Sequence, residues 1–380
     1  MNNSVKFLAV ADQIKRERVA AKPIVARLRS DINDMWDCDV PQQWRTAGFV
    51  QELTDTAAEV LKVEPRKALA ISQYAIVIAT SIAEGVYPDP IPAVIEAEAW
   101  KQLGNAHRYL SEFDAALRAL DAAEKRLEGA AAADWERAIV RFARACVLCD
   151  MHRLDEAGVL AEETGAVFEQ YKERRRAGHA LLLKGTIEHR SMRFDDSVAT
   201  FARAIDLLEQ TDDLRGLASA YNNFGYSQSE RGAFPSAVSA LQKALSIFEE
   251  LNLLGEIART RCILASVLVS TQRYQQAGQL FSVGRRAFRE LGMVEEAGIA
   301  GLDLADSMLA AGNPAEARAV VEEVVLEFRT ASLSERAILA LAYLRDIVDT
   351  PRGREAVTVV RQYLHDLRQS PLLIFVPLPE

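Results

Sequence analysis

Small apolar residues recur along this chain at a nearly constant spacing of 40 residues. Two series share the spacing, with one step of 41 residues and then four steps of 40. The first series is Gly104, Ala145, Gly185, Gly225, Ala265 and Ala305, and the second is Ala116, Ala157, Ser197, Ala237, Ala277 and Ala317. A fixed period of about 20 to 50 residues indicates stacked repeats, because each unit then buries its apolar face only against its neighbours.

Larger residues follow the same period in the same register. One bulky series lies between the two small ones, and a further apolar series, which includes one alanine, follows the second small series by four residues. These series are Phe113, Leu154, Phe194, Phe234, Tyr274 and Pro314, and then Leu120, Ala161, Phe201, Leu241, Phe281 and Val321. Four series in register over six units predict six copies of one structural element, in residues 97–337.

Each unit is predicted to be two amphipathic helices joined by a tight turn. In the fourth unit, residues 218–228 and 235–250 have helical apolar spacing, and Arg231-Gly232-Ala233 lies between them. Gly232 and Gly312 hold the same place in their units, where glycine accepts the left-handed backbone that ends a helix. Gly225 and Ala237 are expected to let the two helices approach closely. Phe234 is then expected to fill the space before the next hairpin.

The pattern resembles the tetratricopeptide repeat, whose signature is an aromatic residue, Leu-Gly, a further bulky residue, and then Ala-x3-Phe. The residues that carry the resemblance are Trp100, Leu103, Gly104 and His107 with Ala116 and Leu120, and Tyr221, Phe224 and Gly225 with Ala237 and Leu241. The period of 40 exceeds the usual length of about 34 residues. The proline that usually ends the second helix is also missing. Both departures favour longer helices, as in the extended repeats of kinesin light chains and bacterial peptide-pheromone receptors.

The resemblance implies an all-α fold, an α-α superhelical solenoid of stacked helical hairpins. The expected organisation has five parts. These are residues 1–47 as a partly basic helical segment, 48–96 as a degenerate first hairpin and a proline-rich loop (84–92), 97–337 as the repeats, 338–370 as a capping hairpin, and 371–380 as an apolar tail. In the first hairpin, Ala57 and Ala68 are the expected small contacts, and the capping hairpin is expected to pair residues 338–348 with 354–367.

The tail has five consecutive large apolar residues bounded by prolines, at positions 372–376. Proline prevents it from extending the preceding helix, and an exposed apolar strand would promote aggregation. Three arrangements remain open from the sequence. The tail caps the final hairpin, it occupies a groove of its own or of a neighbouring chain as a ligand mimic, or it is free until a partner binds.

Charge argues against general nucleic-acid binding, since the net charge is −9 and the pI is near 5.3. Residues 14–30 are a local exception, in which six basic residues oppose Glu17 alone. The basic residues are Lys15, Arg16, Arg18, Lys22, Arg27 and Arg29. They form either a solvated helical face or a contact with an acidic partner or with nucleic acid. The second alternative would suit a signal-responsive transcriptional regulator of the peptide-receptor type.

No targeting signal is evident, and no apolar run reaches the roughly 18 to 20 residues of a membrane span. Four cysteines without a framework spacing favour a reducing, cytoplasmic location. Cys146 and Cys149 form a C-x2-C pair, but zinc binding normally needs a second pair, so they are expected to pack inside a helix. Catalytic, metal-binding and cofactor motifs are absent from the sequence, and we expect a non-enzymatic protein without a cofactor.

Function is expected on the concave side, which the first helix of each repeat lines in tetratricopeptide arrays. Unit positions 2, 5, 9 and 12 form one helical stripe facing that groove. The candidate residues on or beside the stripe are Lys101, Asn105, Arg108, Phe142, His179, His189, Asn222, Asn223, Tyr226 and Arg259. In the sixth repeat the stripe positions are Leu302 and Asp306. Such a mixed stripe suits an extended peptide or a partner helix, with Asn amides on its backbone and Phe142 or Tyr226 contacting an apolar anchor. For each residue, packing between hairpins is the alternative role.

One subclass of the family binds acidic C-termini through a clamp of Lys and Asn residues. Lys101 and Asn105 match its first two positions. The next repeats then offer Ala143 and Leu183, where the clamp requires an amide and a basic residue. The partner is therefore expected to be a protein or peptide segment of another kind.

Overall fold

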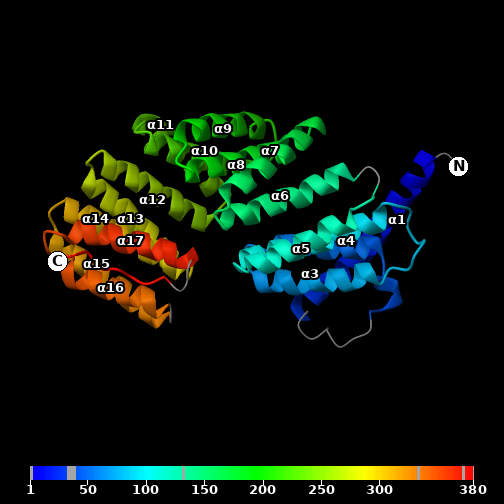
Figure 1. Ribbon diagram of the computed structural model, residues 1–380, viewed down its shortest axis with the longest axis horizontal. Coiled ribbons are helices and arrows are strands. Elements are labelled where there is room, and N and C mark those ends of the chain that lie inside the picture. The colour runs from blue at the N-terminus through cyan, green and yellow to red at the C-terminus, as the bar shows by residue number, and fades with distance from the viewer. Residues whose placement is uncertain (1–2, 32–39, 131–132, 332–333, 370–372, 380) are drawn as a thin grey trace. The chain divides into compact units, whose positions relative to one another are not determined.

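The computed structural model of this chain describes residues 3–31, 40–130, 133–331, 334–369 and 373–379. Helices are the only regular structure in these ranges, so the predicted all-α class is confirmed (Figure 1). The chain divides into two compact units, residues 1–187 and 188–380, and the division lies within α8. Consecutive helices from α1 to α7, and from α9 to α17, pack against each other as stacked hairpins.

Unit 1 holds the helices before the division. They are α1 (Asn3–Asp31), the short 3-10 helix η2 (Gln42–Trp44), α2 (Ala47–Val60), α3 (Pro65–Thr80), α4 (Ile91–Tyr109), α5 (Phe113–Arg126), α6 (Asp134–Asp150), α7 (Leu154–Gln170) and most of α8 (Arg174–Arg190).

Unit 2 begins with the last residues of α8. It continues with α9 (Phe194–Leu208), α10 (Leu214–Glu230), α11 (Phe234–Glu250), α12 (Leu254–Ser270), α13 (Tyr274–Glu290), α14 (Val294–Ala310), α15 (Pro314–Thr330), α16 (Glu335–Ile347) and α17 (Gly353–Gln369). Residues 373–379 follow without helical structure.

The periodic residues have the positions that their spacing predicts. Each member of the first bulky series is the first residue of a second helix, from Phe113 in α5 to Pro314 in α15. The second small series, from Ala116 to Ala317, is completely buried at every position. The apolar series four residues later is at most 2% exposed throughout. The sequence period therefore predicts where each second helix begins and which of its faces is buried.

The turn between the two helices of each repeat contains one residue in the left-handed region. Gly232 and Gly312 have φ values of 75° and 85°, as predicted. The same turn position is left-handed in the other repeats, although it is not glycine there: Ser111, His152, Met192 and Gln272. In the fourth repeat, the Ala233 N–H donates to the Gln228 carbonyl at 2.9 Å and closes the helix end. The hairpin geometry thus overrides the local cost of positive φ.

The two helices of the fourth repeat approach closely at Gly225. A Cβ atom there would lie 2.8 Å from Cγ of Leu241 and 3.1 Å from the carbonyl oxygen of Ala237. Gly104 has the equivalent relation to Leu120 in the first repeat. Phe234 packs in the same cluster as Val267 of the following hairpin, as its position predicts.

The predicted degenerate hairpin is formed by α2 and α3, and its small contacts Ala57 and Ala68 are buried. The proline-rich loop is slightly shorter than predicted, because α4 already begins at Ile91. Pro92 therefore lies in the first turn of α4, where a missing N–H is tolerated.

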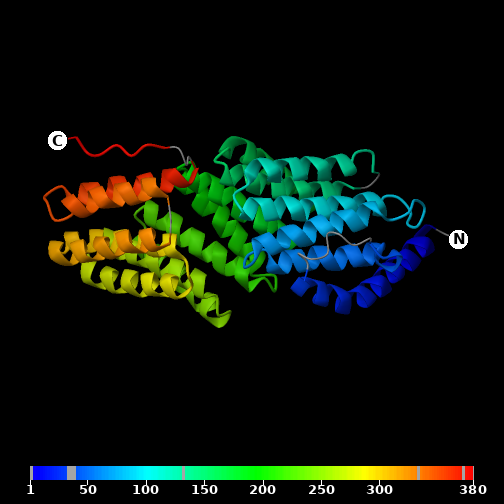
Figure 2. The same cartoon turned by 90° about the horizontal axis from the view of Figure 1, so that it is seen from below.

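Helix α1 lies against α2 in unit 1 (Figure 2). Glu17 accepts hydrogen bonds from the Tyr87 hydroxyl at 2.7 Å and from the Gly48 N–H at 3.1 Å. Arg18 pairs with Glu52 at 3.0 Å and also contacts Asp55. Among the other basic residues of this stretch, Lys15, Arg16, Lys22 and Arg27 are exposed, and the side chain of Arg29 lies outside the described residues.

The final hairpin is formed by α16 and α17, close to its predicted bounds. Helix α17 also packs against α14. Residues 373–379 run back in extended form along this hairpin (Figure 2), where Phe375 and Leu378 are partly buried against its apolar cluster. Of the three arrangements open from the sequence, the structure thus shows the tail on the final hairpin. Pro371, Leu372 and Glu380 lie outside the described residues.

We predict that Gly225→Leu destabilises unit 2 by roughly 1–3 kcal/mol or more, because a side chain at this contact would overlap Leu241 and a carbonyl oxygen. Urea unfolding followed by circular dichroism measures the free energy of unfolding. Ser266→Leu is the control, since Ser266 is exposed on a first helix. Equal stability of Gly225→Leu and the unaltered chain would contradict the close-contact account.

Candidate functional site

The basic candidates of unit 1 are neutralised by acidic neighbours. Lys101 is buried, and its Nζ lies 2.7 Å from both carboxylate oxygens of Glu98. Arg108 donates from Nε to Asp150 at 2.6 Å, linking α4 to α6. Asn105 donates to the side chain of Gln102 at 3.2 Å. Lys101 and Arg108 are therefore both engaged by carboxylates of the chain itself.

Aromatic residues gather where α6 meets α7. Phe142 is half-buried and lies edge-on to Phe168, with ring centroids 5.9 Å apart, so much of its ring serves packing. Trp135 contacts the same Phe168 at 5.4 Å, and the Arg176 guanidinium lies 5.4 Å from the centre of the Trp135 ring. Trp135 and Arg176 were not among the sequence candidates, because both precede the stripe positions in their helices. His179 is half-buried on α8.

The cysteine pair lies inside α6, as predicted. Cys149 is buried, and burial raises the pKa of the Cys146 thiol to about 11, although Arg108 opposes the shift. A thiol with so high a pKa is protonated near neutrality and is a poor nucleophile. Among the described residues, His, Cys, Asp and Glu side chains form no group suited to holding a metal ion. Within the same ranges, no helix is both long and apolar enough to cross a membrane.

In unit 2 the candidates lie along the first helices of successive repeats. We call the surface made by His189, Asn222, Asn223, Tyr226, Arg259, Asp303 and Asp306 the first-helix face of unit 2. Contacts between the helices make it continuous. The His189 ring lies 4.5 Å from that of Tyr226, joining α8 to α10. Asn222 Oδ1 accepts from the Thr260 hydroxyl at 3.0 Å, joining α10 to α12.

His189 hydrogen-bonds to one hydroxyl group, which a second hydroxyl group contacts in turn. Its Nδ1 lies 2.9 Å from Oγ of Ser227, which in turn lies 2.9 Å from Oγ of Ser197. Burial lowers the pKa of His189, and the neighbouring Arg190 charge lowers it further. The neutral ring therefore serves as a support for Tyr226, whose side chain remains 41% exposed.

The two asparagines have different roles. Asn222 is engaged on both sides of its amide, since it accepts from Thr260 and donates to Asn223 Oδ1 at 3.2 Å. The Nδ2 group of half-buried Asn223 makes no hydrogen bond within the described part of the chain and stays available as a donor. Asn222 thus positions Asn223, which is the better candidate for ligand contact.

Charged pairs lie on this face at α12 and α14, the last of its helices in chain order. Arg259 lies 3.3 Å from Glu296 and 3.4 Å from Glu256. Asp303 contacts Arg361 of α17 at 2.5 Å, and Asp306 contacts Arg354 at 2.9 Å. Burial raises the pKa of Asp303, while Arg361 opposes that shift.

The sequence did not predict all of these charged residues. It placed Leu302 on the stripe, but Leu302 is completely buried and the neighbouring Asp303 takes the surface position. Arg354 and Arg361 belong to α17, outside the repeats, so the 40-residue period carries no signal for them.

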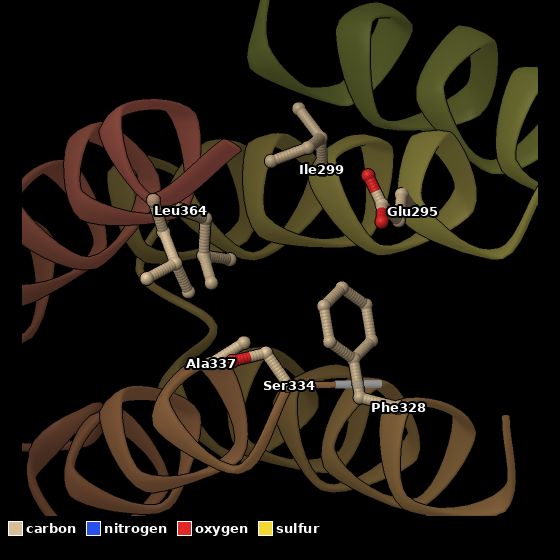
Figure 3. A pocket seen from close by; sticks show the side chains of 7 residues that line it. Glu295, Ile299, Phe328, Ser334, Ala337 and Leu364 are labelled. Atoms are coloured by element: carbon tan, nitrogen blue, oxygen red, sulfur yellow. The ribbon is translucent and has the colours of Figure 1, made fainter. Parts of the chain in front are cut away.

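An apolar cavity of about 110 Å³ lies away from these residues, among α14, α15, α16 and α17 (Figure 3). Its lining consists of Glu295, Ile299, Phe328, Ser334, Ala337, Leu364 and Leu367. The Phe328 ring lies over Gly298, where a Cβ atom would come within 2.2 Å of it. The cavity is thus a gap in the packing of the last helices and includes none of the sequence candidates.

We predict that His189 makes unit 2 less stable in mild acid. Because its pKa is lowered in the folded chain, the unfolded chain binds more protons below about pH 6.5. The contribution of His189 to the free energy of unfolding is therefore constant above that pH, and it falls as the pH decreases through the pKa of His189 in the folded chain. His189→Asn, with an amide in place of the ring, should show a flatter dependence of the unfolding free energy between about pH 6.5 and 5. Identical pH profiles would contradict this assignment.

Comparison with known proteins places the hairpins in a family. The model of the tetratricopeptide repeat matches residues 176–250, and no curated protein sequence matches the chain. The crystal structure of a Rap protein complexed with competence and sporulation factor has a TM-score of 0.60 at 15% identity, covering 96% of this chain and 97% of that one.

Two further structures are similar over most of their length. Aspartyl phosphate phosphatase F from Bacillus subtilis has a TM-score of 0.56 at 14% identity, covering 96% of this chain and 94% of that one. The Rap conjugation gene regulator of the plasmid pLS20, in complex with the Phr* peptide, has a TM-score of 0.55 at 13% identity, covering 90% and 100%. At such identities the likeness concerns the fold alone. With its periodic hairpins and the matching repeat model, the chain is a tetratricopeptide-type repeat protein.

Proposed function

We propose that the chain is a non-enzymatic, cytoplasmic adaptor or regulator that binds an extended peptide or protein segment on the first-helix face of unit 2. The observation that carries the proposal is the pairing of Tyr226 with Asn223. The Tyr226 ring is 41% exposed, yet it is supported by His189 at 4.5 Å. Beside it, Asn223 retains a free amide donor that Asn222 orients.

This arrangement suits peptide recognition for two physical reasons. A supported aromatic ring offers apolar contact area while losing little side-chain freedom on binding. An amide donor matches the backbone carbonyls that every extended peptide presents, and gives affinity without requiring a particular side chain. The paired charges beyond them, such as Arg259 with Glu296, would add selectivity more than affinity.

The similar structures support the peptide class of ligand. One is a Rap protein complexed with competence and sporulation factor, and another is a regulator in complex with the Phr* peptide. A third is a phosphatase for aspartyl phosphate. For this chain we propose binding without catalysis, because Arg259, Asp303 and Asp306 on the face are paired with opposite charges and His189 Nδ1 is hydrogen-bonded to the Ser227 hydroxyl.

A selection experiment tests the proposal. Random twelve-residue peptides displayed on phage are selected on the unaltered chain, and the enriched sequences are measured by fluorescence anisotropy. We predict that Asn223→Ala with Tyr226→Ala raises the dissociation constant by at least about tenfold, equivalent to about 1.4 kcal/mol. Asn222 is left unaltered because its bond to Thr260 joins two repeats.

The matched control removes an amide and an apolar side chain from second helices. Gln279→Ala with Leu326→Ser changes residues of α13 and α15, and Leu326 is 65% exposed. This control should bind the selected peptides as the unaltered chain does. Equal affinity of the Asn223/Tyr226 variant and the unaltered chain, with both folded, would overturn the proposal.

A further inference from the structure

The tail is held by side chains of the final hairpin that contact its backbone. Arg336 donates to the carbonyl of Leu373 at 2.9 Å, and the Tyr363 hydroxyl donates to the same oxygen at 3.1 Å. The Leu378 N–H donates to the Tyr343 hydroxyl at 3.1 Å. Arg352 donates to the carbonyl of Pro379. These contacts use groups that any extended peptide possesses.

A single aromatic side chain of the tail provides the anchor. The Phe375 ring lies 5.3 Å from the ring of Tyr343 and 5.0 Å from that of Tyr363, tilted against the first and edge-on to the second. Tyr363 is itself buried at 6% exposure, so the ring that receives Phe375 is fixed by the packing of α17. An aromatic residue is therefore the side chain that this position selects.

The prolines of the tail favour the extended backbone that contacts the final hairpin. Pro377 and Pro379 fix two backbone angles and remove two N–H donors. An extended segment of this kind loses little conformational freedom when it binds, and its carbonyls remain available to arginine and tyrosine donors.

Covering apolar surface does not by itself account for the arrangement. Ile374 and Val376 are 75% and 74% exposed, although both belong to the apolar run. Side chains alternate along an extended segment, so Ile374 and Val376 face away when Phe375 faces the hairpin, and the tail leaves two large apolar side chains in water. The hairpin instead contacts the backbone and the Phe375 anchor, which is how extended peptides are recognised.

We propose that Arg336, Tyr343, Arg352 and Tyr363 form a second peptide-binding site, separate from the first-helix face of unit 2. Its ligand is an extended protein segment with an aromatic residue followed by alternating prolines, Phe-x-Pro-x-Pro, as in residues 375–379. Those residues are its resident occupant, and a partner segment of the same chemistry displaces them.

The site is independent of the first-helix face, although residues of α17 contact both. Arg352 and Tyr363 contact the tail, whereas Arg354 and Arg361 contact Asp306 and Asp303 of α14. Displacing the tail leaves the contacts with α14 in place. Because the tail is tethered, its effective concentration is on the order of millimolar, and an external ligand must compete with it.

A labelled peptide with the sequence of residues 371–380 tests the site by fluorescence anisotropy. The full-length Phe375→Ala chain should bind this probe with a dissociation constant at least about tenfold lower than that of the unaltered chain, because its own tail has lost the anchor. Ile374→Ala is the control, since Ile374 is exposed, and it should bind as weakly as the unaltered chain. A probe with Phe replaced by Ala should bind to none of them.

Specificity is tested by adding Arg336→Gln to the Phe375→Ala chain. This change should raise the dissociation constant of the probe again, because it removes the donor that bonds to the carbonyl of Leu373. Circular dichroism verifies folding, and Phe375→Leu, which removes the aromatic ring but keeps an apolar side chain, replaces Phe375→Ala as the receptor if the latter is unfolded. No gain of binding in a folded receptor would overturn the proposal. Equal binding to all chains, or of the probe without Phe, would show non-specific apolar adhesion and overturn it too.

Discussion

Close approach of paired helices at positions without a bulky side chain is the constraint on which the rest of this structure depends. At Gly225 a single added carbon would come within 2.8 Å of Leu241, and the facing series of small residues, from Ala116 to Ala317, is completely buried. Once the helices meet at these points, the apolar residues four positions further on fill the remaining space. The hairpin geometry is thus fixed by packing rather than by helix propensity.

The turns follow from that packing and determine the functional surface. Every repeat has a left-handed residue at the same turn position, including bulky Met192. The second helix therefore starts at a constant place, and the first helices present equivalent positions side by side. In unit 2 these positions bring His189, Asn222 and Tyr226 together, although they come from separate helices or turns. A change of only a few side chains at these equivalent positions would then be enough to adapt the face to a ligand.

Periodicity predicted the repeats well because small residues leave a strict spacing wherever helices touch. It also put Tyr226 on the stripe and Asn223 beside it, and Tyr226 is 41% exposed while Asn223 is half-buried. Periodicity did not predict other features of the site, for physical reasons. Lys101 looked available, but Glu98 one turn earlier neutralises it. Leu302 and Asp303 are adjacent, and adjacent positions of a helix point about 100° apart. A stripe placed one residue out of register therefore selected the buried Leu302 instead of Asp303. Arg361 reaches Asp303 from a helix outside the repeats, and spacing gives no information about such a contact.

The central claim is that the first-helix face of unit 2 is the surface on which a partner binds. Photo-crosslinking tests it most directly, with p-benzoylphenylalanine in place of Tyr226 or, as the outer reference, in place of Leu326, which is 65% exposed on α15. Both chains are irradiated in lysate of the cells that the protein comes from, and adducts are identified by mass spectrometry. The account predicts a defined adduct at position 226 that a selected peptide suppresses, and none at 326. An adduct only at 326, or the same adducts at both positions, would contradict it.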